Sequence, residues 1–344
     1  MIEIDGSYGS GGGAVLRTAI GLSIVTGKPV KIFNIRKNRL HGGLKAQHLE
    51  GLKAAAELCS ADLKGAEPNS TEVEFHPKEI KKSDLKININ TAGSVGLVFQ
   101  ILKLIALKIK EPIEIEIEGG ATFGKWAPPL LTTKNILLSV LEKMGYKASI
   151  NIEKHGFFPV GGAHVEFKFH PCKELKPLNL TEIGNITHTG GMSIASVHLR
   201  KSRVAERQTN DAVRFLKSHG LKPMIKEMYV ESDCPGSGIV LWASDGRTII
   251  GSDCIGEKSK KSEDIGFEAA ESLYKTIISN SGIDPHISDQ LLVFMALAKG
   301  VSTITTSRLS NHTKTNIWVI KKFLDVDFDV VEKKNVLIRC SGSK

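Results

Sequence analysis

The residue with the clearest chemical potential is His312, within the polar segment 310–316 of sequence SNHTKTN. A strand-like alternation ends just before this segment and a helical pattern follows it, so His312 is expected at a strand-to-helix corner. There we expect an exposed imidazole with a near-neutral pKa, able to attack an electrophile through its neutral nitrogen. Taken singly, a surface or capping histidine is the simpler explanation, so a chemical role needs support from other residues.

A second polar corner comprises His286, Ile287, Ser288, Asp289 and Gln290, where a helix over 288–298 is predicted to begin. Asp289 and Gln290 fall in the first turn, where the helix dipole stabilises a carboxylate. Such a carboxylate also suits a simple capping role. The pattern alone therefore does not separate ligand binding from capping.

Glycine dominates the loop 6–13, GSYGSGGG, which joins a short predicted strand to a helix that carries Arg17 one turn in. Without side chains, backbone N–H groups can approach an anion closely, and a helix N-terminus adds favourable partial charge. The loop therefore suits a phosphate or the end of a nucleotide. It matches neither the P-loop nor the dinucleotide-binding pattern, and a merely tight connection fits it equally well.

Gln100 is an uncharged polar residue surrounded by apolar ones in the predicted helix 94–108. Its amide needs a hydrogen-bond partner, which is either a core backbone group or a ligand, and the apolar pattern favours the core. The turn-rich loop 155–162, HGFFPVGG, joins two predicted strands, and most such loops only set strand register.

Positive charge is unevenly distributed along the chain. The whole sequence has 46 Lys and Arg against 37 Asp and Glu, yet residues 181–278 hold 13 of each sign, so the surplus lies outside that block. Six basic residues fall within 28–45, a stretch without a carboxylate: Lys28, Lys31, Arg36, Lys37, Arg39 and Lys45. A polyanion, either nucleic acid or a phosphorylated substrate, is the natural partner, and a solvated basic face is the alternative.

Composition places the chain among folded globular proteins. With 344 residues, 41% of them hydrophobic, it is not a disordered chain, a collagen-like repeat or a disulfide miniprotein. No apolar run is long enough to cross a bilayer and the N-terminus does not resemble a signal peptide, so we expect a cytoplasmic protein without a membrane partner. The five cysteines include no C-x-x-C pair and are predicted to be isolated thiols, although Cys234 and Cys254 could pair. The sequence leaves the oligomeric state open.

The elements that must position these residues alternate between strands and helices. Strands are predicted over 30–36, 72–76, 85–90, 113–119, 148–153 and 164–170, and helices over 12–25, 43–59, 94–108 and 128–144. The order recurs roughly every 80 to 100 residues, from near Met1, Leu85, Asn185 and Asp284. This predicts an α+β fold of repeated units, with a large domain over 1–180 and 279–344 and a small α/β domain inserted over 181–278.

Taken together, the motifs resemble those of the RNA 3′-terminal phosphate cyclase family, in the family's order and over nearly the whole chain. The matching landmarks are the Gly-rich loop with Arg17, the block from Arg36 and Arg39 to Gln47 and His48, Gln100, the 127–129 turn with Pro128, the loop 155–162, Asp289 with Gln290, and His312 with Thr315 and Asn316. Any one of these is weak. Seven in register are unlikely to be accidental.

The resemblance implies repeated βαβαββ units with one related unit inserted, and it implies a chemistry. His312 would attack the α-phosphorus of ATP to form histidyl-AMP, AMP would pass to an RNA 3′-phosphate, and the neighbouring 2′-OH would displace AMP to leave a 2′,3′-cyclic phosphate. By the same resemblance, the phosphates in transfer would be stabilised by Arg17, Arg36 and Arg39. The ATP site would be lined by Gln100, Pro128 and residues 286–290. The RNA end would be held by Arg36, Arg39, Gln47 and His48. A divalent cation, Mg²⁺ or Mn²⁺, would assist.

Three positions depart from the family pattern: Ser10 stands where the family has Glu, Ala14 where it has Gln, and His286 where it has Tyr. The missing Glu is a hard oxygen ligand of the kind that Mg²⁺ prefers, so the metal ligand is not assigned. We hypothesise that Ser10→Glu raises the rate of enzyme adenylation. One alternative is a non-catalytic relative that binds RNA during ribosome assembly, but such relatives lack the histidine nucleophile. The other is a small-molecule transferase of the enolpyruvyl transferase type, which would leave His312 unexplained.

Overall fold

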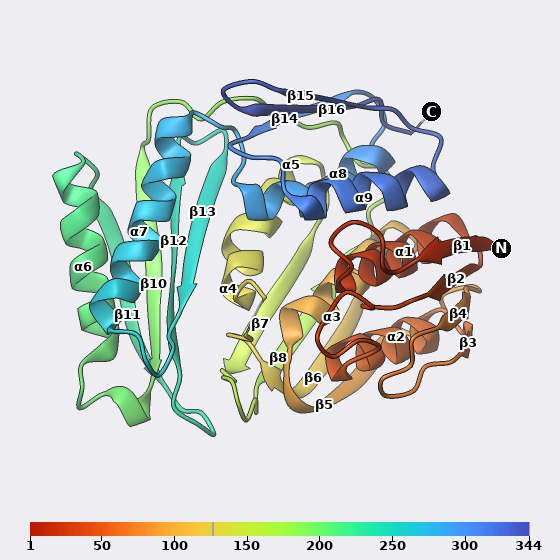
Figure 1. Ribbon diagram of the computed structural model, residues 1–344, viewed down its shortest axis with the longest axis horizontal. Helices are drawn as coiled ribbons and strands as arrows, with labels where there is room; N and C mark the ends of the chain where they lie inside the picture. Colours follow the sequence, from red (N-terminus) through yellow and green to blue (C-terminus); the bar gives the residue numbers. More distant parts are fainter. Residues whose placement is uncertain (126, 344) are drawn as a thin grey trace.

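The computed structural model describes residues 1–125 and 127–343, and these form four sheets of four strands each (Figure 1). Three of the sheets share one strand order and lie together on one side of the molecule, and the fourth stands beside them with its own two long helices. The α+β fold class predicted from the sequence is confirmed.

The first unit contains β1 (Ile2–Asp5), α1 (Gly13–Thr26), β2 (Val30–Phe33), α2 (Ala46–Leu58), β3 (Asp62–Lys64) and β4 (Val73–His76). Its sheet order is β1-β2-β4-β3, with β1 parallel to β2 and the other pairs antiparallel. Strand β2 alternates between buried and partly exposed residues, as expected for a strand with one face on the core.

The second unit repeats this order with β5 (Asp84–Ser94), α3 (Val95–Leu102), β6 (Ile113–Ala121), β7 (Ala148–Lys154) and β8 (His164–Phe169). The clean Ile/Glu alternation of β6 has the predicted effect: its isoleucines are buried and its glutamates point to the wet face. Two predicted helices are interrupted. The first becomes a 3₁₀ turn at Lys103–Leu107, and the second is divided into α4 (Leu130–Thr132), a π turn (Thr133–Leu137) and α5 (Leu138–Lys143).

The third unit is split in sequence. Its first strand is β9 (Asn179–Leu180), and the rest follows much later as α8 (Pro285–Leu297), β14 (Ser302–Thr306), α9 (Asn311–Phe323), β15 (Phe328–Glu332) and β16 (Val336–Cys340). The sheet again joins first, second, fourth and third strands in that order, and β9 is parallel to β14. The predicted start near Asp284 was therefore wrong for this unit, because the two residues of β9 are too few to show a strand pattern.

The segment between β9 and α8 forms the fourth sheet, from β10 (His188–Ser196), β11 (Pro223–Val230), β12 (Ser237–Ser244) and β13 (Ile249–Ile255), with α6 (Val204–Ser218) and α7 (Ser262–Ser279). Its order along the chain is βαβββα, so the expected repeat of the βαβαββ unit near Asn185 is wrong. Much of it packs around a separate small core, while Ile194 and Val240 join the large one. The predicted division at 181 and 278 stays a prediction.

All five cysteines are free thiols, so Cys234 and Cys254 do not pair and the prediction of isolated thiols is confirmed. Within residues 1–125 and 127–343, no helix combines the length and the apolar character that crossing a membrane would require.

Candidate active site

A cleft of about 1040 Å³ lies where the three repeated units meet the edge of the fourth sheet. It is lined by eleven of the residues predicted for the site: Arg17, Arg36, Arg39, Gln47, His48, Gln100, Pro128, His286, Asp289, Gln290 and His312. Two others, Ile287 and Ser288, do not line it and are fully buried behind the first turn of α8. Residues up to about 300 positions apart in the chain are thus brought to one cavity.

His312 lies in the first turn of α9, which begins at Ser310 because the Ser310 hydroxyl accepts a hydrogen bond of 3.0 Å from the Thr313 backbone N–H. Its side chain is half-buried, where full exposure was expected. Burial lowers the pKa of His312, and nearby Arg17 and Arg39 lower it further. The imidazole is therefore neutral at physiological pH, the form that a nucleophile requires.

The first turns of α9 are fixed against the Gly-rich loop, α1 and α8. The Thr315 hydroxyl accepts a hydrogen bond of 3.1 Å from the backbone N–H of Ser10 in the Gly-rich loop. Asn316 accepts from the Thr18 hydroxyl at 3.0 Å and donates to the Asp289 carbonyl at 2.9 Å. Gly9 has a φ of +59°, and a Cβ there would lie 2.3 Å from the Thr315 hydroxyl, so only glycine fits. This network sets the position of His312 relative to α1 and α8.

Arg17 is half-buried in the cleft wall, and its Nε donates a hydrogen bond of 2.7 Å to Oε1 of Gln100. The partner of the Gln100 amide is thus a guanidinium at the cleft, not a core backbone group as the sequence pattern favoured. Burial lowers the pKa of Arg17 to about 10, which leaves it charged, and its two terminal nitrogens remain to face an anion.

His48 packs beside Arg17 under the Gly-rich loop. A Cβ on Gly13 would lie 2.3 Å from His48 Nε2 and 2.6 Å from Arg17 Nη1, so the glycine is needed for this approach. Burial, with Arg17 as the next cause, lowers the pKa of His48 to about 3. Its Nδ1 accepts a hydrogen bond from the Lys45 backbone N–H at 3.3 Å, so the neutral ring carries its proton on Nε2.

Arg36 and Arg39 hold different positions in the basic loop. Arg36 braces the loop, because its Nη1 donates to the carbonyls of His41 at 2.9 Å and Gly43 at 3.0 Å. The Arg39 side chain is exposed and lies against the Gly-rich loop, where a Cβ on Gly12 would come within 2.8 Å of its Nη2. Arg39 is therefore the more exposed of the two, and Arg36 is held by the loop backbone.

Sequence reasoning missed three charged residues that line the cleft: Lys103, Asp253 and Lys125. Lys103 is buried, and its Nζ donates to the Gln290 carbonyl at 3.1 Å and lies over the Phe294 ring. Burial lowers the pKa of Lys103 to about 7 and raises that of nearby Asp289 to about 6. The sequence did contain a sign that Lys103 is unusual, because it is the one charged residue in the apolar run 95–106.

Asp253 is the second missed residue, and it comes from β13 of the inserted segment. Its Oδ2 accepts a hydrogen bond of 2.9 Å from the Thr132 hydroxyl, and burial raises its pKa to about 6. No local pattern marked it, because only the folded chain brings β13 to the cleft.

The described side chains do not fit a divalent cation held mainly by the protein. The carboxylates that line the described part of the cleft are Asp253, which already has a hydroxyl partner, and Asp289, which lies among Lys103, Arg17 and His286. Ser10 does not line the cleft, and its Oγ is buried with no hydrogen-bond partner. A metal ion would need most of its ligands from elsewhere, so no chemical step is assigned to one.

Basic side chains greatly outnumber acidic ones around the described cleft. Six of them line it: Arg17, Arg36, Arg39, Lys45, Lys103 and Lys125. Ligand sites commonly have volumes up to about 1000 Å³. The cavity therefore has the size and charge for a nucleoside triphosphate together with a second phosphate group.

Comparison with known proteins agrees with this geometry. Residues 8–330 match the family described as RNA 3′-terminal phosphate cyclase. Among curated proteins, one of that name from Methanopyrus kandleri is 42% identical over 341 residues, covering 97% of this chain and 96% of the relative. Others of the same name are from Pyrobaculum aerophilum, 42% identical with 96% and 95% covered, and from Methanosarcina barkeri, 40% identical with both chains covered completely.

Proposed function

The chain belongs to the RNA 3′-terminal phosphate cyclase family, and from that premise we propose that it uses ATP to convert the 3′-terminal phosphate of an RNA into a 2′,3′-cyclic phosphodiester, with His312 as the nucleophile. It would then be a ligase-type enzyme of nucleotidyl transfer. The observation that carries the proposal is the neutral imidazole of His312 in a cleft lined by guanidinium and ammonium groups.

In the first step a ring nitrogen of His312 forms a bond to the α-phosphorus of ATP, and the bond from that phosphorus to the bridging oxygen breaks. Pyrophosphate leaves with the electron pair, and the ring then loses its N–H proton to solvent. Negative charge on the phosphates is stabilised by the cationic groups on the cleft walls, of which Arg17 is held in a fixed orientation by Gln100. A phosphoramidate with imidazole is itself reactive enough to pass the AMP group onward.

In the second step the ring regains a proton from solvent, an oxygen of the RNA 3′-phosphate attacks the same phosphorus, the P–N bond breaks to release neutral His312, and the RNA end becomes a mixed anhydride with AMP. A phosphate monoester lacks a good leaving group, and the anhydride supplies AMP as one. The adjacent 2′-OH then attacks the RNA phosphorus and loses its proton to solvent, AMP departs with the electron pair of the broken P–O bond, and the ring closes. Because the hydroxyl is already adjacent to the phosphorus, positioning accounts for most of the catalysis in this step. The need for a 2′-OH makes RNA the productive substrate.

The basic loop supports the placement of the RNA end. Arg36, Arg39, Gln47 and His48 line the same cleft as Pro128, His286 and Asp289. We assign the first group to the RNA phosphate and the second to ATP. A non-catalytic RNA-binding protein of the same family would need the same basic loop but not a neutral histidine beside it, so His312 favours the enzyme.

The test is incubation with ATP labelled at the α-phosphorus and a divalent cation, followed by denaturing electrophoresis. Labelled protein should form, and the label should be acid-labile and stable to alkali, as a phosphoramidate is. His312→Ala should abolish it, while His76→Ala, which changes a histidine on β4 outside the cleft, should not. Folded protein that binds ATP without acquiring label would exclude the histidyl-AMP route and favour a binding role.

A further inference from the structure

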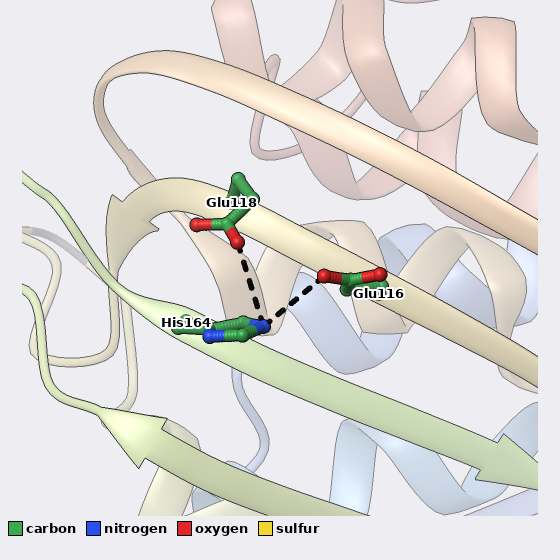
Figure 2. A group of neighbouring side chains, drawn as sticks. All are labelled: Glu116, Glu118 and His164. Atoms are coloured by element: carbon green, nitrogen blue, oxygen red, sulfur yellow. Dashed lines mark ion pairs between the residues drawn. The ribbon is translucent and has the colours of Figure 1, made fainter.

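A second histidine with concentrated charge around it lies away from the cleft, on the wet face of the β5-β6-β8-β7 sheet (Figure 2). Glu116 and Glu118 extend from β6, two residues apart and on the same face, and His164 begins β8 directly opposite Glu118. The three side chains place one ligand atom each within 4.8 Å of one another. Figure 2 shows both carboxylates pointing toward the same edge of the imidazole ring.

The spacing matches that of a metal coordination shell. His164 Nε2 lies 3.3 Å from Oε1 of Glu116 and 3.5 Å from Oε1 of Glu118. Zinc bonds to nitrogen and carboxylate oxygen are about 2.0–2.2 Å long, so the ligand atoms of a tetrahedral zinc ion lie roughly 3.3–3.5 Å apart. An ion could therefore enter between these atoms with small side-chain rotations.

The other ring nitrogen is held in the way that metal-binding histidines require. His164 Nδ1 lies 3.2 Å from Oε2 of Glu153, on the neighbouring strand β7. A carboxylate that accepts the Nδ1 proton leaves the Nε2 lone pair free for a metal and fixes the plane of the ring. This arrangement of carboxylate, histidine and two further carboxylates goes beyond a group of acidic side chains.

The side chains around the His164 ring carry an excess of negative charge. Lys86 pairs with Glu116 at 2.6 Å, but through Oε2, the oxygen that does not face His164. One imidazole faces three carboxylates, which it cannot neutralise. A divalent ion bound by two of them would bring the local charge close to balance.

Neighbouring positions show what an ordinary surface pair looks like. Glu114, the next outward residue of β6, is paired with Lys168 at 2.5 Å. His76, on β4 of the first unit, lies 3.9 Å from Glu74 and opposite Asp62 of β3, but the ligand atoms of these side chains do not come together as they do at His164. Neither position offers three ligands, so both supply matched controls.

We propose that Glu116, Glu118 and His164 bind one divalent transition-metal ion of the zinc type, with a water as a further ligand and Glu153 as the group that orients the histidine. The mixture of one imidazole nitrogen with two carboxylate oxygens suits zinc better than magnesium. The ion would join β6 to β8 at the base of loop 155–162, whose Phe158 and Pro159 line the cleft.

The experiment titrates ZnCl₂ into the full chain by calorimetry, after treatment with EDTA and without ATP. Wild type should bind one more zinc ion than His164→Gln or Glu118→Gln, and zinc should raise its melting temperature. Glu153→Gln should retain the site with an affinity about 10- to 100-fold lower, the size of effect expected for a group that orients a ligand. His76→Gln and Glu114→Gln should behave as wild type.

Zinc bound by histidines of the cleft would appear equally in every one of these proteins, so the difference between variants reports on the new site alone. Circular dichroism of the metal-free variants checks that they fold. If His164→Gln does not fold, Glu118→Gln is the variant compared with wild type. Equal zinc stoichiometry and affinity in wild type and the folded variant would overturn the proposal. Wild-type affinity in Glu153→Gln would overturn the orienting role.

Discussion

His312 and His164 are the same side chain in opposite electrostatic surroundings. His312 lies in the cleft beside Arg17 and Arg39, whereas His164 lies on an open sheet face among Glu116, Glu118 and Glu153. Cations around an imidazole oppose its protonation and keep a nitrogen free to attack phosphorus, while the same cations attract the phosphate. Carboxylates around an imidazole supply additional ligands for a metal ion. The charge of the neighbours, more than the histidine itself, therefore separates a nucleophile from a metal ligand.

The largest expected effect comes from removing a cation on the His312 side of this comparison. Arg39→Gln should lower the single-turnover rate of enzyme adenylation by about 100-fold, because an exposed guanidinium that can reach the phosphates is lost from the transition state. Lys37→Gln is the matched control, since Lys37 is an exposed cation of the same loop that does not line the cleft. Equal losses in the two variants would mean that the general charge of the loop matters, and not a specific contact.

A smaller effect is expected from adding a carboxylate at Ser10 of the Gly-rich loop, which makes the charge beside the cleft more like that of the outer face. Ser10→Glu should raise the single-turnover adenylation rate at least about threefold, because it supplies a hard oxygen ligand to the cation that accompanies ATP. Ser10→Gln, of the same size without the charge, should give no gain. The hypothesis fails if Ser10→Glu and wild type react at equal rates.

The smallest effect concerns pH. Only the neutral imidazole attacks, and the pKa of His312 is lowered, so wild-type adenylation should persist on the acid side of neutrality. Between pH 7.5 and pH 6.5, the usual imidazole pKa, the single-turnover rate should fall by less than about twofold. In Arg39→Gln the fall should be steeper over the same range, because one neighbour that lowers the pKa is gone. A wild-type profile with its acid limb centred above pH 6.5 would contradict the role of the surrounding cations.

Much of the fold was predictable because its elements are long and periodic. The alternation in β6 identified both the strand and its wet face, and the helix predicted over 288–298 was placed within three residues of its actual start at Pro285. The two-residue strand β9 could not be found, because a period of two needs several residues to be visible. The π turn inside the predicted helix 128–144 was equally hidden, since its apolar pattern continues through the turn.

For the site, sequence motifs located residues but not their partners. The amide of Gln100 was seen to need a partner, yet Arg17 is 83 residues away and becomes its neighbour only in the folded chain. Lys103 carried a visible signal, a lone charge in an apolar run, and was overlooked. Asp253 carried none, because its importance arises from where the inserted segment touches the rest of the protein.

The separation of β9 from β14 affects how the chain can fold as it is made. The first two sheets are complete when their own stretches of sequence have left the ribosome, but the third joins strands about 124 residues apart in the chain. At about 5–20 residues per second, β9 waits for several seconds before its partner emerges. The fourth sheet is synthesised during that interval, and by folding on itself it shortens the loop that β14 must close. Because β14 leads directly into α9, His312, the proposed nucleophile, reaches its place only in this last closure.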